Sequence, residues 1–325
     1  MSTAAPSPET TPRLLIARAV LAVGAAVDPR LAARWAEALF FTPPRPRKSR
    51  TVLPAGARRL DVASPSGPVA AWSWGSGPAV YLVHGWGGRA EQLGAFVAPL
   101  VARGFRVVAL DGPGHGASPG RRSSGPEIGR ALAAAAGRIA PAHGVVAHSL
   151  GAAAVVFAMR EGLRVGRVAF VGAPADPLEW VETFGRRLRL DGRVMAEMRR
   201  RSESRLSARW DDLPILPLRD LAGPPPLLVV HDHDDREVPW RDGAAIAAGW
   251  PGARLMETRG LGHRRVLRDP RVIEAVAAFL GEGQAKETCA HGRPVSSASC
   301  EACALETELF APALRRRPAE AFTRH

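Results

Sequence analysis

The amino-acid sequence predicts an α/β fold built on a mostly parallel, doubly wound sheet. Short β-branched and aliphatic runs alternate with longer runs in which apolar residues recur at helical spacing. The short runs are apolar almost throughout, as expected of parallel strands that helices cover on both faces. With 325 residues, 46% of them hydrophobic, the chain has room for one large globular domain with appendages.

The order of these runs predicts the layout of the sheet. Strand-like runs lie at 58–63, 68–74, 79–84, 106–110, 144–148, 167–172, 226–231 and 253–258. Helical runs lie at 90–103, 126–139, 151–163, 241–249 and 270–280. The residues Ser64-Pro65-Ser66-Gly67 favour a hairpin turn between the first two strands. From the third strand onward, an intervening helix allows each parallel crossover.

The chain is expected to divide into three regions. Residues 1–50 combine a Pro/Ser/Thr-rich start that we expect to be disordered, helical runs at 13–27 and 29–40, and a proline-rich linker. Residues 51–281 form the α/β domain, and residues 282–325 form a small C-terminal tail that contains Cys and His.

One segment, at about 177–223, does not fit the alternation of strands and helices. It carries tryptophan, phenylalanine and methionine residues among many arginines, which indicates a short helical insertion. Because ligands of such sheets bind at the carboxyl ends of the strands, an insertion over that edge predicts a lid. The alternative is a solvated arginine-rich face with a few aromatic residues packed beneath it.

The charge pattern does not indicate a nucleic-acid partner. The formal net charge is +13, but Lys48 and Lys286 are the only lysines, and the arginines are scattered without interleaved aromatic residues. The apolar run 14–27 contains Arg18 and is too short to cross a bilayer, so we expect no transmembrane segment. We expect a cytoplasmic protein, and the alternative is export with this run as a signal peptide.

A candidate nucleophile follows the predicted strand at 144–148. Ser149 stands between this strand and a predicted helix, and the residues two positions away on either side, Ala147 and Gly151, are small. This layout is typical of a nucleophile elbow, a sharp turn that needs small neighbours and lifts the serine hydroxyl clear of the sheet. The turn also directs the backbone N–H of Leu150 toward a substrate.

A serine hydroxyl needs a base, and the base needs a carboxylate that orients it. His263 lies in a glycine-flanked loop after the last predicted strand, from which an imidazole can reach the serine. Asp232, Asp234 and Asp235 all follow the preceding strand, and the residue pattern alone does not choose between them. The alternative role for any of these aspartates is to cap the next turn or helix.

A glycine-rich loop predicts an oxyanion hole. His84-Gly85-Trp86-Gly87-Gly88 directly follows a strand, and its glycines free the backbone to aim an N–H at a reacting carbonyl oxygen. The N–H groups of Trp86 and Leu150 are the expected donors, each of a kind that contributes about 3 to 4 kcal/mol. The alternative is a glycine-rich connection without a chemical role.

Together these motifs resemble the α/β-hydrolase family. The matching stretches follow the family's order within about residues 58–281, at 84–88, 111–118, 148–151, 235–239 and 262–263. The resemblance implies an α/β-hydrolase-type sheet with a short helical lid. It implies these site residues: the nucleophile Ser149, the base His263, and the oxyanion donors Trp86 and Leu150.

The resemblance also selects one carboxylate. The family often places its acid four residues before the proline of a Val-Pro pair, which implies Asp235. Some members carry the acid after the preceding strand, where Asp176 is the alternative. The sequence departs from the family at Ala147, where the usual pentapeptide has glycine.

The function that the resemblance implies is hydrolysis of carboxylic esters through an acyl-enzyme intermediate. The expected partner is a small-molecule acyl substrate, with no cofactor for catalysis. Serine at the elbow differs from the aspartate of haloalkane dehalogenases and epoxide hydrolases. A thioesterase, an amidase or a peptidase would use the same residues, and a non-catalytic binding or scaffold protein would retain the fold. No motif specifies the acyl chain, the leaving group or the oligomeric state.

The C-terminal tail holds every cysteine of the chain, so the sequence does not indicate a disulfide scaffold. Three thiolates and one imidazole form a tetrahedral zinc set, and Cys-x-x-Cys is a chelating spacing. The tail therefore predicts a structural Zn²⁺ with no catalytic role, and the alternative is a flexible tail with reduced thiols. The candidate ligands are Cys289, His291, Cys300 and Cys303.

Overall fold

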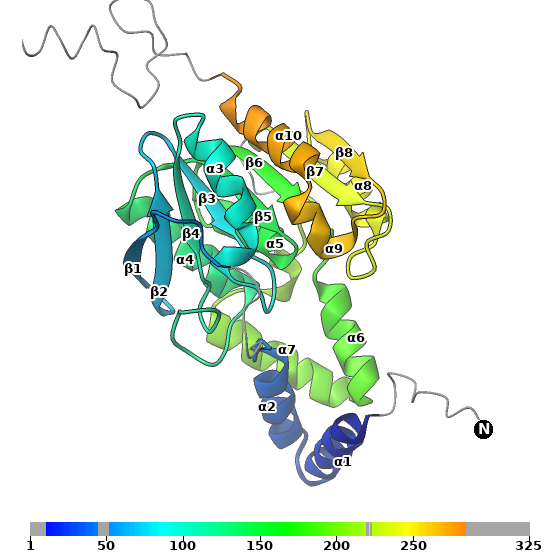
Figure 1. The fold of residues 1–325 in the computed structure, drawn as a ribbon. Coiled ribbons are helices and arrows are strands. Elements are labelled where there is room, and N and C mark those ends of the chain that lie inside the picture. The colour runs from blue at the N-terminus through cyan, green and yellow to red at the C-terminus, as the bar shows by residue number, and fades with distance from the viewer. Residues whose placement is uncertain (1–10, 45–51, 219–220, 222, 284–325) are drawn as a thin grey trace, which may run out of the picture. The chain divides into compact units, whose positions relative to one another are not determined.

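An eight-stranded sheet forms the centre of the computed structural model, which describes residues 11–44, 52–218, 221 and 223–283 (Figure 1). Its order is β1-β2-β4-β3-β5-β6-β7-β8. The strands are β1 Arg58–Ser64, β2 Gly67–Trp74, β3 Ala79–Val83, β4 Arg106–Leu110, β5 Ala142–His148, β6 Val165–Val171, β7 Leu227–Asp232 and β8 Arg254–Thr258.

The pairing of the strands confirms a mostly parallel sheet. β1 and β2 form an antiparallel hairpin, β2 runs antiparallel to β4, and the other neighbours are parallel. The hairpin turn holds Gly67 at φ 101°, a conformation that glycine adopts without a steric penalty. The carboxyl ends of β3, β5, β6, β7 and β8 therefore meet at one edge, which is where the candidate site residues follow their strands.

Helices cover both faces of the sheet (Figure 1). The described α-helices are α1 Pro12–Val27, α2 Pro29–Phe40, α3 Val97–Val101, α4 Gly125–Arg138, α5 Leu150–Arg160, α6 Leu178–Leu188, α7 Gly192–Leu206, α8 Trp240–Gly249, α9 Gly262–Arg265 and α10 Pro270–Gly281. The helix expected at 90–103 is instead a 3-10 helix, Ala90–Phe96, followed by the short α3. Pro99 has no N–H for a helical hydrogen bond and is tolerated only in a first turn, so a continuous α-helix across this position is disfavoured.

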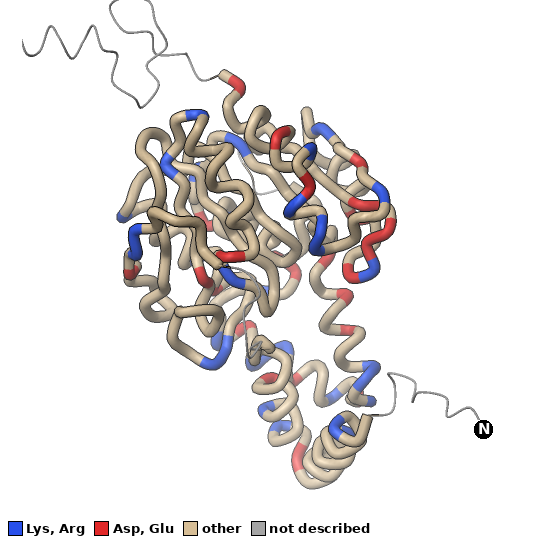
Figure 2. Tube along the Cα trace, viewed as in Figure 1, with Lys and Arg blue, Asp and Glu red and all other residues tan. Residues whose placement is uncertain are grey.

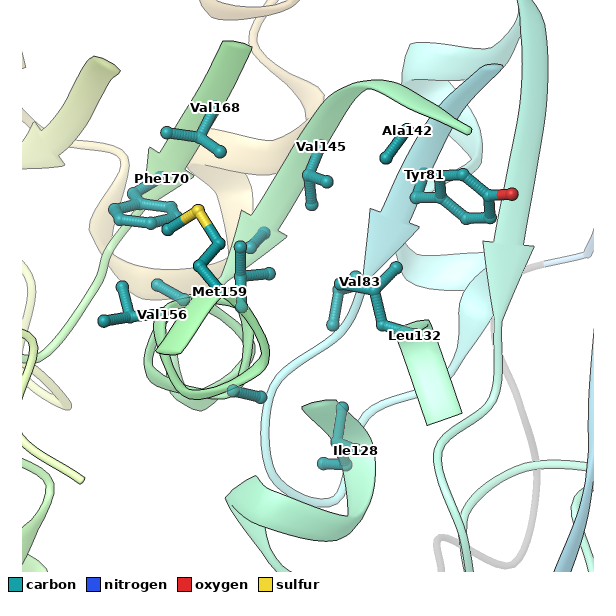
Figure 3. Close-up of a cluster of buried hydrophobic side chains, with 14 of the residues drawn as sticks. Tyr81, Val83, Ile128, Leu132, Ala142, Val145, Val156, Met159, Val168 and Phe170 are labelled. Atoms are coloured by element: carbon teal, nitrogen blue, oxygen red, sulfur yellow. The ribbon is translucent and has the colours of Figure 1, made fainter. Parts of the chain in front are cut away.

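Alternate side chains of each strand supply the two core layers. In β3, Tyr81 lies in one core layer with Leu132 of α4, and Met159 of α5 belongs to the same layer beside Phe170 of β6 (Figure 3). The next residue, Leu82, packs on the opposite face with Phe279 of α10. Because both faces are covered in this way, the strands are buried on both sides, as their continuous apolar sequences predict.

A third apolar cluster joins the N-terminal helices to the inserted helices. Leu21 of α1, Phe41 after α2, Leu188 of α6 and Met198 of α7 are all buried in it. The segment 177–223 is thus largely helical where it is described, as expected. Its many arginines are not simply a solvated face, because several contact acidic side chains and aromatic rings within the fold.

Charged residues of both signs are spread over the described helices and loops rather than gathered in one region (Figure 2). No described helix combines the length and the apolar character that crossing a membrane requires. The expectations for the first ten residues, for most of the proline-rich linker and for the C-terminal tail concern positions outside the described residues.

Candidate active site

Ser149 occupies a sharp turn between β5 and α5. Its φ is 54° and its ψ is −129°, a backbone conformation that is strained for a residue with a side chain. The Ser149 N–H donates to the carbonyl of Val171 (3.0 Å), and the Ser149 carbonyl accepts from the N–H of Ala152 (2.9 Å). These bonds hold the strained turn between strand and helix, which is the geometry expected of a nucleophile elbow.

The small residues around Ser149 are required by close backbone contacts. A Cβ on Gly151 would lie 2.8 Å from the carbonyl oxygens of both Val83 and His84. A Cβ on Gly85 would lie 2.8 Å from the Cβ of Ser149. Ala147, which stands where the family's pentapeptide has glycine, is fully buried, so a methyl group fits at that position.

His263 and Asp235 form a buried hydrogen-bonded pair. The Nδ1 of His263 lies 2.7 Å from Oδ2 of Asp235, and each residue is at most 9% exposed. The other carboxylate oxygen of Asp235 accepts the N–H groups of Glu237 (2.8 Å) and Val238 (2.9 Å). Burial alone would raise the pKa of Asp235, but the hydrogen bonds from His263 and the two backbone N–H groups outweigh it and lower that pKa below its ordinary value.

The other candidate carboxylates accept hydrogen bonds from main-chain N–H groups rather than from the His263 ring. Asp232 accepts two N–H groups of the loop that precedes His263, at 2.9 and 3.1 Å. Asp234 accepts the N–H of Gly260 at 2.7 Å. Asp176 accepts an N–H of the first turn of α6 at 2.8 Å. The hydrogen bonds of the described residues thus pair His263 with the Asp235 carboxylate.

His148, which the sequence analysis did not single out, supports the loop of His263. Its Nε2 lies 2.9 Å from the main-chain oxygen of His263, so Nε2 carries the proton and donates it. The two imidazole rings also pack with centroids 4.5 Å apart. Burial lowers the pKa of His148 to about 3, and it therefore stays neutral at neutral pH.

Two more histidines hold the glycine-rich loop after β3. His84 accepts the N–H of Gly112 at Nε2 (2.9 Å), so its proton is on Nδ1, which donates to the Gly85 carbonyl (2.7 Å). His115 accepts the N–H of Gly87 at Nε2 (3.0 Å). Burial lowers the pKa of His84 to about 4. Neutral imidazoles, rather than the glycines alone, therefore fix the path of this loop.

The two expected oxyanion donors face the same pocket as Ser149 and His263. Leu150 is the first residue of α5, so its N–H has no acceptor within the helix. The hydrogen bonds of the described residues include none from the Trp86 N–H and none between Ser149 Oγ and the His263 ring. Free enzymes often complete the serine–histidine bond only when a substrate is bound.

The predicted zinc ligands Cys289, His291, Cys300 and Cys303 lie outside the described residues. Within the described ranges, no group of three or more His, Cys, Asp and Glu side chains is arranged to hold a metal ion.

A serine on a strand-to-helix turn, beside a buried histidine–aspartate pair at the carboxyl edge of a mostly parallel sheet, defines the class of enzymes with the α/β-hydrolase fold. Residues 80–276 match the model of the family described as "Alpha/beta hydrolase family". This match covers more than half of the chain, and the protein belongs to the α/β hydrolase family.

Solved structures show the same fold at low sequence identity. An esterase of Pyrococcus furiosus superposes with a TM-score of 0.55 at 18% identity, over 74% of this chain and 96% of that one. An esterase of Thermogutta terrifontis superposes with a TM-score of 0.51 at 20% identity, over 69% of this chain and 98% of that one. A bromoperoxidase of Bacillus anthracis superposes with a TM-score of 0.50 at 18% identity, over 69% of this chain and 99% of that one. No curated protein sequence matches the chain. The substrate must therefore be argued from the site.

Proposed function

We propose that the protein hydrolyses carboxylic esters with Ser149 as the nucleophile, His263 as the general base and Asp235 as the carboxylate that orients the base. The observation that carries the proposal is the 2.7 Å bond between His263 and Asp235 beside a pocket that both Ser149 and His263 line. Because Asp235 accepts the proton of Nδ1, Nε2 of the neutral imidazole is left to accept the serine proton.

The reaction takes two balanced steps. His263 Nε2 takes the proton of Ser149 Oγ while Oγ bonds to the ester carbonyl carbon, and the N–H groups of Trp86 and Leu150 stabilise the resulting oxyanion. The bond to the alcohol oxygen then breaks, and His263 returns the proton to the departing alcohol. Water repeats the sequence on the acyl-enzyme, which releases the carboxylic acid and restores the Ser149 hydroxyl.

The charge of Asp235 supports this mechanism. Its lowered pKa keeps the carboxylate ionised at neutral pH, so it stabilises the imidazolium that forms when His263 takes the proton. The Asp235 side chain is only 1% exposed, and water screens its charge little.

A fluorophosphonate probe combined with short p-nitrophenyl esters tests the proposal. The wild-type protein should be labelled and should release p-nitrophenol, whereas Ser149→Ala should lose both, with turnover reduced at least about a thousandfold. The matched control is Ser66→Ala, an exposed serine in the turn between β1 and β2. This variant should retain the labelling and the turnover of the wild type.

The alternatives give different results in the same experiment. A non-catalytic scaffold would leave Ser149 unlabelled and every ester intact, which would contradict the proposal. An enzyme with the same residues but another substrate would be labelled at Ser149 and would prefer a thioester or an amide over the matched ester. Equal turnover by Ser149→Ala and the wild type would remove the assignment of the nucleophile.

A further inference from the structure

The pocket at Ser149 is larger than most small-molecule sites. Its volume is about 1480 Å³, whereas pockets for small ligands usually measure roughly 300 to 1,000 Å³. Besides the loops at Ser149 and His263, its lining comes from α1, α2, α5, α6 and α7 and from the segment after α7. The site therefore has room for much more of a substrate than the reacting ester group.

Away from the serine and histidine loops, the buried part of this lining is strongly apolar. Its buried side chains there include Phe41, Phe157, Val181, Leu188, Leu206 and Trp210, each at most 8% exposed. Several charged residues that line the pocket, such as Arg187, Glu237 and Arg264, are exposed, so they mark where the pocket meets solvent. The interior thus offers contacts to hydrocarbon and few partners for polar groups.

One face of α5 connects the nucleophile to this interior. Leu150, Ala153 and Phe157 all line the pocket, and their spacing of three and four residues places them on the same side of the helix. At 1.5 Å per residue, they lead from Ser149 about 12 Å along the helix. Ala153 is the smallest side chain on this path, so it leaves space between Leu150 and Phe157.

The N-terminal helices are a fixed part of the pocket wall. The Phe41 carbonyl accepts the N–H of Ser123 (2.8 Å), and the ring of Phe40 packs on Phe184 of α6 with centroids 5.0 Å apart. Glu37, buried in α2, accepts from Arg205 of α7 at 2.8 Å. Hydrogen bonds, ring packing and an ion pair therefore join α2 to α6, to α7 and to the body of the enzyme.

We infer that this pocket binds a long aliphatic acyl chain, so that the substrates are esters of medium- and long-chain fatty acids. The inference rests on the proposed function, and it names the acyl group that Ser149 receives. Each methylene that leaves water for the apolar lining favours the bound state by a factor of up to about four. A polar acyl group would lose its hydrogen bonds to water and find few replacements there.

The test compares p-nitrophenyl butyrate with p-nitrophenyl dodecanoate, both supplied as monomers. The wild type should show a kcat/KM for the dodecanoate at least about tenfold above that for the butyrate. Ala153→Leu narrows the path on α5 and should remove most of this preference, because kcat/KM for the dodecanoate should fall far more than that for the butyrate. Val181→Trp, which enters the pocket from α6, should act in the same way and serves if the first variant does not fold.

A matched control and a binding measurement separate the two proposals. Ala102→Leu adds the same side chain at an exposed position outside the pocket and should keep the chain-length preference. Dodecanoate should quench the tryptophan fluorescence of Ser149→Ala protein, because Trp180 and Trp210 line the pocket.

The outcomes are distinct. A wild type that hydrolyses the butyrate in a Ser149-dependent manner but shows no preference for dodecanoate would overturn the inference and leave the proposed function intact. Dodecanoate that quenches the Ser149→Ala protein, without hydrolysis of any ester by the wild type, would overturn the proposed function and support the apolar site.

Discussion

His148 donates a hydrogen bond from its Nε2 to the main-chain oxygen of His263, across 2.9 Å. His148 is also the residue directly before Ser149 in the chain. The same short segment therefore carries the proposed nucleophile and supports the backbone of the proposed base. The relative position of these two groups is set by a neutral, fully buried imidazole as well as by the turn itself.

Replacing this imidazole should affect catalysis more than binding. His148→Phe keeps a ring against His263 but leaves the His263 carbonyl without its donor, at a cost of about 1 to 3 kcal/mol. We expect kcat to fall about tenfold with KM nearly unchanged, as measured with a p-nitrophenyl ester. The control is His143→Phe, because His143 makes a similar bond to the Leu280 carbonyl (3.0 Å) and does not line the pocket. Equal losses of kcat in both variants would contradict a positioning role for His148.

The neighbouring aspartates should differ sharply in their effect on turnover. Asp235→Asn replaces the acceptor that holds the His263 tautomer, so kcat should fall about 10⁴-fold. Asp234→Asn makes the same chemical change at an exposed carboxylate that binds the Gly260 N–H, and kcat should stay within about threefold of the wild type. Steady-state hydrolysis by the two purified variants checks this. A large loss of kcat in Asp234→Asn, with activity retained in Asp235→Asn, would contradict the assignment of Asp235 as the carboxylate that orients His263.

Acid should destabilise the fold through its buried histidines. Burial lowers the pKa of His84 to about 4 and that of His148 to about 3, from 6.5. Burial also raises the pKa of Asp111 to about 6, from 3.8. Between pH 4 and 6 the unfolded chain therefore binds a proton on each of these two histidines that the folded state does not, and the folded state binds one on Asp111 that the unfolded chain does not. Burial also lowers the pKa of His231, which adds to the effect of the histidines.

The net uptake of protons on unfolding sets the sign of this effect. Stability should decrease as the pH falls from about 6 to 4, by about 1.4 kcal/mol per pH unit or more, because the contributions of His84, His148 and His231 are lost on acidification while the Asp111 contribution partly opposes them. Urea unfolding at several pH values measures the slope. In His148→Phe one histidine proton is removed, and the slope should fall by about 1.4 kcal/mol per pH unit; an unchanged slope would show that His148 does not titrate in this way.

A methyl group should have opposite effects at two glycines. Gly151→Ala places a Cβ 2.8 Å from the main-chain oxygens of Val83, at the end of β3, and His84, which follows it. We expect a loss of stability of about 1 to 3 kcal/mol. Gly137→Ala, near the end of α4, meets no atom within 4 Å and should stabilise the protein by about 0.5 to 1 kcal/mol. The difference between their urea midpoints measures the contrast, and similar midpoints would argue against the steric requirement at Gly151.

The sequence carries enough information to predict the sheet and the ends of its strands. Ser149 and His263 were predictable because both follow apolar runs, and the carboxyl ends of parallel strands meet at one edge. The choice of Asp235 was not predictable from residue pattern, since Asp232 and Asp234 follow the same strand and have the same chemistry. Only the resemblance to the family selected it. His263 bonds to this carboxylate in the structure, and the catalytic role of Asp235 stays a prediction.

The contacts that support the site could not be predicted from local sequence patterns. His148 and the His263 carbonyl are separated by 115 residues, and the role of the imidazole depends on that contact rather than on its neighbours in sequence. His84 is neutral because it is buried, and burial of a single histidine leaves no periodic signal. The N-terminal helices were predicted as helices, but nothing in their own sequence indicated that they line the pocket.

The ion pair between Glu37 and Arg205 joins residues 168 positions apart. During synthesis α2 leaves the ribosome long before α7 has been made. Glu37 of α2 therefore has no Arg205 to pair with until most of the chain has been synthesised. The pocket at Ser149 is consequently among the last parts of the molecule to be completed. A chain cut before Arg205 would lack the proposed base His263 and the part of the pocket lining from Leu206 onward, so an unfinished molecule would have neither the proposed catalytic pair nor a complete pocket.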